Sequence, residues 1–359
     1  MINKKRLVDT FLELVKIDSP SGEEKQIATV LLKKLQALGG KGGQDAYGNI
    51  IMQFSGEGKP FMINSHMDTV EPGRDIKPIV DGDTIKTDGT TVLGGDAKAG
   101  LAIILESLTS LKEDKKRHTA LEVVLTVEEE TGLIGATHLD YTKITAQRGI
   151  AFDGSKDVQN VTVSAPGYDR IDITIIGKAA HAGSEPEKGL SAIQIASEII
   201  SNFKLGRIDN ETTANIGLIE GGSARNAVPE KVEIHGEIRS RNLKKLEQHT
   251  QHFKETIGHI SKKYKEAKII TEVKREFNPY HFLTTNPTLE QIRKTLEKMG
   301  LSLHEDFAGG GSDVQIFHNH GIEAVVLGIG DYNPHTTREF VKISEMYQGV
   351  QFAELLVQV

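Results

Sequence analysis

The chain has 359 residues, of which 38% are hydrophobic and 26% are charged, so it is long enough for two domains and a sizeable hydrophobic core. A formal net charge of −7 argues against a protein that binds nucleic acid or an anionic membrane surface. Cysteine is absent, which excludes disulfides and thiolate metal sites and leaves His, Asp and Glu as candidate metal ligands. The N-terminal residues lack the pattern of a signal peptide, and no apolar run is long enough to span a bilayer. These features predict a cytoplasmic protein.

Helices and short apolar strands alternate in the first 165 residues. Helical spacing predicts a first helix at the N-terminus, and Ser21 with Glu24 three residues later predicts a capping box at the start of the second. Continuous apolar runs predict buried strands, and a longer one predicts an apolar helix. The expected strands are 49–54, 60–64, 121–127 and 149–152, and the apolar helix is 97–111. This alternation predicts an α/β domain with a mostly parallel sheet covered by helices on both faces.

The pattern changes near Ser164. Segments 168–176 and 231–239 alternate apolar and polar residues, which is typical of a sheet with one open face. From there to about Phe277 the expected order is βαββαβ, that of a ferredoxin-like α+β domain. After Phe277 helices and apolar strands are again expected to alternate, as in the first part of the chain. The sequence therefore predicts a catalytic domain, residues 1–165 and 277–359, that is split by an inserted smaller domain, residues 166–276.

Histidine and acidic residues gather at the ends of the expected strands. The groups that follow strands are His66 with Asp68, the run Glu128 to Glu130, Asp153, and His335, while Asp96 begins the apolar helix. Each has a simpler interpretation alone, such as a surface histidine, a solvated glutamate run or a helix N-cap. In open α/β sheets, however, sites form outside the carboxyl ends of the strands. Together these residues make two nearly complete sets of nitrogen and oxygen ligands, whereas His318 and His320 fit a helix C-terminal dipole without a metal.

Nine motifs, from about residue 5 to the end of the chain, resemble the co-catalytic zinc exopeptidase family. They are SHMDTV, GGDAKAG, EEETG, FDGS, GKAAHAGSEPEKG, GGSARNAVPE, EIRSRN, GGGSD and NPHTT. That family includes aminoacylase, succinyl-diaminopimelate desuccinylase, glutamate-releasing carboxypeptidases and peptidase T, and the sequence is most similar to the peptidase T-like branch. The resemblance implies a zinc-binding α/β domain with an inserted lid that forms a homodimer, in agreement with the split predicted from the strand patterns.

The resemblance also implies a ligand set for two Zn²⁺ ions per chain, for which Mn²⁺ or Co²⁺ could substitute. Asp96 would bridge both ions. His66 and Asp153 would complete one site. Glu130 and His335 would complete the other.

Three further residues would take part in catalysis. Glu129 would be the general base that moves a proton from the attacking water to the leaving amine. Asp68 would orient His66. His181, supplied by the partner subunit, would stabilise the oxyanion, although a plain loop histidine is the simpler alternative.

Substrate contacts are expected from Asn226, from Arg239, whose guanidinium suits a carboxylate, and from the backbone at Gly309 and Gly310. A surface arginine and a flexible turn are the simpler alternatives for the last three. The peptidase T pattern has an arginine where this chain has Gly309, so the substrate stays open.

The leading prediction is a tripeptide aminopeptidase of the peptidase T type. An N-acyl-amino-acid deacylase or a carboxypeptidase on the same scaffold is the main alternative. A binding protein that retained the fold without catalysis is a third hypothesis, and it is disfavoured because all the ligand and base positions are intact.

Overall fold

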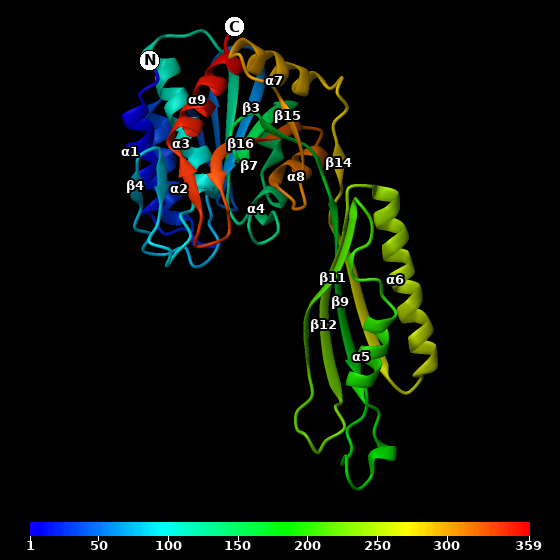
Figure 1. Cartoon of the computed structure of the whole chain (residues 1–359). Coiled ribbons are helices and arrows are strands. Elements are labelled where there is room, and N and C mark those ends of the chain that lie inside the picture. The colour runs from blue at the N-terminus through cyan, green and yellow to red at the C-terminus, as the bar shows by residue number, and fades with distance from the viewer. The chain divides into compact units, whose positions relative to one another are not determined.

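The structure is a computed structural model that describes residues 1–359 (Figure 1). The chain divides into two compact units, of which unit 1 comprises Met1–Val163 with Phe282–Val359 and unit 2 comprises Ser164–His281. The domain limits expected from the sequence, after residues 165 and 276, lie close to these unit limits.

Unit 1 is built on a 12-stranded sheet whose main path is β1-β2-β6-β3-β7-β16-β17-β5-β4. The four central strands, β6, β3, β7 and β16, run parallel, and antiparallel strands flank them. The strands are β1 (Lys41–Gln44), β2 (Ile50–Phe54), β3 (Glu57–His66), β4 (Ile79–Asp81), β5 (Thr84–Lys86), β6 (Thr119–Thr126), β7 (Arg148–Ser155), β8 (Asn160–Ala165), β14 (Tyr280–His281), β15 (His304–Phe307), β16 (Glu323–Tyr332) and β17 (Phe340–Lys342).

The central strands are buried on both faces. Phe61 to His66 are six consecutive buried residues in β3, although neighbouring side chains point to opposite faces of a sheet. Helices α1 and α9 pack on α3, which in turn contacts the central strands. The helices of unit 1 are α1 (Lys4–Val15), α2 (Lys25–Ala37), α3 (Gly95–Glu113), α4 (Ile134–Thr137), α7 (Pro287–Lys298), α8 (Asp313–Asn319) and α9 (Ile343–Val357). The predicted α/β class with a mostly parallel central sheet is confirmed. No helix in the structure has both the length and the apolar character that crossing a membrane requires.

The capping box predicted from Ser21 and Glu24 is wrong. Helix α2 begins after Glu24, whose side chain makes no capping bond. Instead the carboxylate of Glu24 accepts N–H bonds from Gly22 at 3.0 Å and Glu128 at 2.9 Å. The Ser21 hydroxyl donates to Asp68 at 2.7 Å. Both side chains therefore connect the start of α2 to the segments that carry expected site residues.

Unit 2 is a two-layer α+β fold. Its elements are β9 (Gly167–Ile176), α5 (Ala192–Ser201), β10 (Gly206–Arg207), β11 (Thr212–Gly221), β12 (Lys231–Ser240), α6 (Leu243–Lys263) and β13 (Lys268–Phe277). The strand order is β10-β11-β12-β9-β13, with every pair antiparallel, so the main strands follow the expected ferredoxin-like arrangement. Ile171, Ile173 and Ile175 face the core with residues of α5 and α6, as the alternating pattern predicts, while the other face of the sheet lacks covering helices.

Candidate metal centre

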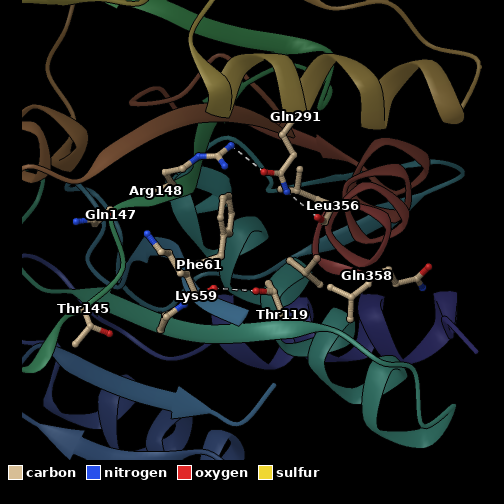
Figure 2. A pocket seen from close by; sticks show the side chains of 12 residues that line it. Lys59, Phe61, Thr119, Thr145, Gln147, Arg148, Gln291, Leu356 and Gln358 are labelled. Atoms are coloured by element: carbon tan, nitrogen blue, oxygen red, sulfur yellow. Dashed lines mark hydrogen bonds between the residues drawn. The ribbon is translucent and has the colours of Figure 1, made fainter. Parts of the chain in front are cut away.

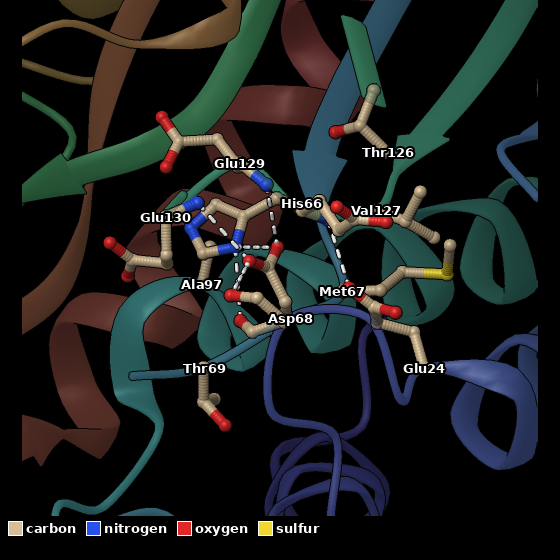
Figure 3. A network of polar contacts seen from close by, with 12 residues as sticks. Glu24, His66, Met67, Asp68, Thr69, Ala97, Thr126, Val127, Glu129 and Glu130 are labelled. Carbon is tan, nitrogen blue, oxygen red and sulfur yellow. Dashed lines mark hydrogen bonds and ion pairs between the residues drawn. The ribbon is translucent and has the colours of Figure 1, made fainter. Parts of the chain in front are cut away.

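The expected ligands of unit 1 lie at one edge of the sheet. His66 is the last residue of β3, Glu129 and Glu130 follow β6, and Asp153 lies near the end of β7. Because β3, β6 and β7 run parallel, their carboxyl ends meet at this edge. Asp96 lies at the start of α3. Figure 3 shows His66, Asp68 and the two glutamates close together.

His66, Asp96 and Asp153 form the first of three groups whose ligand atoms all lie within 4.8 Å of one another. The Nε2 atom of His66 lies 3.0 Å from Asp96 Oδ1 and 3.1 Å from Asp153 Oδ1. Three donor atoms thus converge on one position at the carboxyl end of β3.

Asp96, Glu130 and His335 form the second group. The Nε2 atom of His335 lies 2.9 Å from Glu130 Oε1 and 3.3 Å from Asp96 Oδ2. One carboxylate oxygen of Asp96 therefore faces His66 and the other faces His335, which is the arrangement that a bridging ligand requires. The third group, His66 with Glu129 and Glu130, does not by itself distinguish the two glutamates as ligands.

Asp68 is fully buried and bonds to several residues at this edge of the sheet. Its side chain lies 3.2 Å from His66 Nδ1 and accepts the backbone N–H groups of Glu129 and Glu130, each at 3.1 Å. The hydroxyl of Ser21 is a fourth partner. Since Nδ1 of His66 bonds toward Asp68, its Nε2 atom is left to face the two carboxylates.

Burial and crowding of acidic groups dominate the electrostatics. Burial raises the pKa of Asp153 to about 6, and the charges of Asp96 and Glu130 act in the same direction. Burial, reinforced by the charge of Asp153, raises the pKa of Glu129 well above its usual value. Burial also raises the pKa of Glu130, against the hydrogen bond from His335. The negative charges of these carboxylates repel one another, and the ion-pair partners of Asp96, Asp153 and Glu130 are histidines, with no lysine or arginine among them.

The donor set fits divalent metal ions. Each of the first two groups offers one imidazole nitrogen and two carboxylate oxygens, and Asp96 is common to both. Two dications would neutralise the buried carboxylates that now repel one another. Imidazole with carboxylate suits zinc, manganese and cobalt.

In unit 2, the segments that carry His181 and Asn226 lie side by side. An isolated β-bridge joins His181 to Ala227, and the Ala182 N–H donates to the carbonyl oxygen of Asn226 at 2.9 Å. The Nδ1 atom of His181 accepts N–H bonds from Gly183 at 3.2 Å and Ser184 at 3.0 Å. Because Nδ1 accepts, the neutral ring carries its hydrogen on Nε2, which makes this exposed histidine a donor.

Arg239 lies at the other end of the unit 2 sheet. It pairs with Tyr168 in the strand register, whereas Lys231, at the start of β12, pairs with Ile176 at the end of β9. At about 3.3 Å per residue, the stretch of β12 from Lys231 to Arg239 spans roughly 26 Å. The guanidinium donates to both carboxylate oxygens of Glu237, at 3.0 and 3.1 Å, and lies 4.7 Å from the Tyr168 ring centroid.

Gly309 and Gly310 border open space, since an added Cβ at either would meet no atom within 4 Å. Three residues further, Asp313 was missed as a candidate although it belongs to the same motif. It is buried, accepts a hydrogen bond from Thr126, and burial raises its pKa to about 7. Asp313 begins α8 and bonds to Thr126, the last residue of β6. The local sequence contains no signal that brings these two elements together.

A cavity of about 640 Å³ lies at the opposite edge of the sheet, where β3, β6 and β7 begin (Figure 2). Its charged side chains are Lys59 and Arg148, and the Arg148 guanidinium donates to Gln291 at 2.8 Å. Histidine and carboxylate side chains do not line this cavity. It therefore offers no ligand set for a metal cation.

Two family models match the chain. A model of the peptidase family M28 matches residues 49–170, and a model of a peptidase dimerisation domain matches residues 163–266. An uncharacterised protein, YqjE of Bacillus subtilis, is 41% identical over 100% of this chain and 98% of its own length.

Two solved structures are similar over nearly the whole chain. The aminopeptidase PepT of Bacillus cereus is 38% identical with a TM-score of 0.90, and covers 99% of this chain and 98% of its own. A tripeptidase of Staphylococcus aureus is 37% identical with a TM-score of 0.93 and the same coverage.

Proposed function

The chain belongs to the peptidase T-like branch of the M20 peptidase family and is a metallo-exopeptidase, and we propose that it uses two zinc ions to remove the N-terminal residue of tripeptides. The observation that carries this proposal is the carboxylate of Asp96, whose two oxygens face His66 and His335. One bridging carboxylate with two further ligands on each side is the donor set of a two-metal hydrolase.

Ligand roles follow from the contacts. His66 and Asp153 would hold one ion with Asp96, and Glu130 and His335 would hold the other. Bound there, the ions would polarise the substrate carbonyl and acidify a water molecule. Asp68 would keep the His66 ring in its binding tautomer.

Glu129 would move the proton. Only 8% of this residue is exposed, and its backbone is fixed through the N–H bond to Asp68. Its carboxylate would take the proton of the attacking water and pass it to the leaving amine. His181, whose Nε2 carries hydrogen, would donate to the developing oxyanion, and Arg239 would bind the substrate carboxylate.

The dimensions of unit 2 support a site built from two subunits. An extended tripeptide is about 10 Å long, whereas the stretch of β12 from Lys231 to Arg239 alone spans roughly 26 Å. His181 lies beyond the far end of this stretch, since it follows β9, whose last residue Ile176 pairs with Lys231. One unit 2 therefore cannot place both side chains on the same small substrate. A two-fold dimer could, with His181 and Asn226 from one subunit and Arg239 from the other.

An unpaired strand edge offers a surface for that dimer. Strand β10 covers only Thr213 and Ala214 of β11, so the rest of β11 is paired on one side alone. Leu218 and Ile219 in this stretch are 48% and 51% exposed. The opposite edge strand, β13, exposes Lys268, Glu272 and Lys274 beside Ile270, and charges on an edge strand disfavour edge pairing. We therefore propose a homodimer formed through the β11 edge.

A panel of blocked and unblocked peptides tests the activity. The zinc-loaded protein should cleave a tripeptide with free termini and release its first residue, and should leave the N-acetylated tripeptide intact. Glu129→Gln is the control for a contaminating peptidase. Release of the C-terminal residue would indicate a carboxypeptidase, and hydrolysis of N-acyl amino acids alone would indicate a deacylase. Failure on all three substrate classes would refute the proposal.

A further inference from the structure

Three backbone donors that lead into α3 share a single acceptor, the carboxylate of Glu339. Its Oε2 accepts the N–H groups of Leu93 at 2.6 Å and Gly94 at 2.9 Å, and its Oε1 accepts the N–H of Asp96 at 3.1 Å. The first N–H groups of a helix have no partner within the helix. Gly94, at the N-cap, has no side chain to serve as one. A carboxylate from elsewhere in the chain therefore takes the place of the cap, where the helix dipole also favours it.

The same carboxylate belongs to the segment that carries His335. Glu339 lies four residues after His335, and its own N–H closes a turn onto Thr336 O at 3.0 Å. Strand β17 begins at the next residue and is held between β16 and β5. Glu339 is 2% exposed. Glu339 thus connects a fixed strand, the His335 loop and the Asp96 segment.

The atoms around the contact between Glu339 and the Asp96 segment are closely packed. A Cβ added to Gly95 would lie 2.5 Å from Val341 Cγ2, 2.6 Å from Asp331 Oδ1 and 3.0 Å from Glu339 Oε1. The glycine lets the Asp96 segment lie directly against the carboxylate. A glutamine at 339 would keep the volume, but its NH₂ group would replace one acceptor and face a backbone N–H.

We infer that Glu339 is a positioning residue, which holds Asp96 and His335 at the spacing that one metal ion requires. This role rests on the proposed metal site. The Glu130–His335 ion depends on both segments that Glu339 joins, whereas the His66–Asp153 ion depends on Asp96 alone. Loss of the contact should therefore affect the two ions unequally.

Glu339→Gln tests this role by metal titration of the full chain against a chromophoric zinc chelator. Wild type should bind two ions, and the variant should bind one of them about 10- to 100-fold more weakly, the usual effect of removing a group that orients a ligand. Glu354→Gln is the matched control, because Glu354 is also a buried glutamate of unit 1, with Lys116 Nζ 2.5 Å from it. The control should unfold at a lower temperature and keep both affinities. Hydrogen exchange of the metal-free Glu339→Gln protein should show faster exchange at Leu93, Gly94 and Asp96.

Gly95→Ala is the second variant, since its added Cβ would crowd Val341, Asp331 and the Glu339 carboxylate without removing the charge of Glu339. It serves as the test if Glu339→Gln does not fold. It should weaken the same ion. The positioning role would be overturned if wild type bound two ions and the folded variants bound both with unchanged affinity. Wild type that binds no metal would refute the proposed function instead.

Discussion

Complementation between two inactive variants is the sharpest test of the two-subunit site. His181→Ala removes the oxyanion donor and should lower kcat by about 10²- to 10³-fold. Glu129→Gln removes the proton carrier and should lower kcat by about 10²- to 10⁴-fold. Neither substitution should prevent folding, since His181 is exposed and Glu129→Gln replaces one buried polar group with another of similar size.

The size of the rescue follows from the symmetry. Random pairing of the two variants makes about half of the dimers mixed, and one of the two sites in a mixed dimer has both Glu129 and a partner His181 intact. About one quarter of all sites in the unseparated mixture, and about one half of the sites in purified mixed dimers, should then regain wild-type activity. Arg239 lies roughly 26 Å along β12 from Lys231, and His181 lies beyond that end of the sheet, so we expect the two residues to reach one substrate from different chains.

The assay is co-expression of the two variants with different affinity tags, followed by purification of the mixed dimer and a tripeptide hydrolysis assay. Each variant alone, purified in the same way, is the control. Native mass spectrometry establishes that mixed dimers are present. Mixed dimers with no more activity than either variant would show that His181 does not act across the interface.

Three further predictions concern the proposed interface, the role of Asp68 in the candidate metal centre and a half-buried histidine. Leu218→Lys, on the unpaired half of β11, should shift the protein to a monomer in analytical ultracentrifugation, whereas Ile270→Lys on the opposite edge strand should leave the dimer intact. Asp68→Asn should weaken zinc binding by about 10- to 100-fold in a chelator competition, because an amide cannot accept all of the hydrogen bonds that the carboxylate accepts, and unchanged affinity would refute its bracing role. Burial lowers the pKa of His318 below the 6.5 of an unfolded chain, so the stability that this neutral ring contributes is present above pH 6.5 and is lost as the pH falls below it. Urea unfolding from about pH 7.5 to about pH 5.5 should show a smaller loss in His318→Gln than in wild type.

The sequence brings together many residues of the candidate metal centre because their positions follow local rules. Apolar runs mark the parallel strands, and polar residues placed directly after such strands must meet at one edge of the sheet. For this reason His66, Glu130 and Asp153 lie close together although up to 87 positions separate them in the sequence. The alternating pattern of β9 predicted the one-sided sheet of unit 2 for a similarly local reason.

Residues that act at long range could not be predicted in this way. Ser21 fits a capping box in sequence, but its partner in the structure is Asp68, 47 positions away. The donors to Glu339 lie about 245 positions earlier in the chain, and nothing in the local pattern of Glu339 marks it as a cap. Strands β4, β5 and β17 were also missed, since three residues are too few to show a period of two.

The adjacent glutamates show how tertiary contacts separate roles that the sequence leaves equal. Asp68 accepts the backbone N–H groups of both Glu129 and Glu130 at 3.1 Å, so one buried carboxylate holds their main chain in place. Their side chains then differ in what they meet. Glu130 lies 2.9 Å from the Nε2 atom of His335, as a ligand to the same ion would, whereas Glu129 has no ion-pair partner and is raised in pKa chiefly by burial. A carboxylate without a competing cation is the better proton acceptor, and this difference is the physical basis for proposing Glu129 as the base and Glu130 as the ligand.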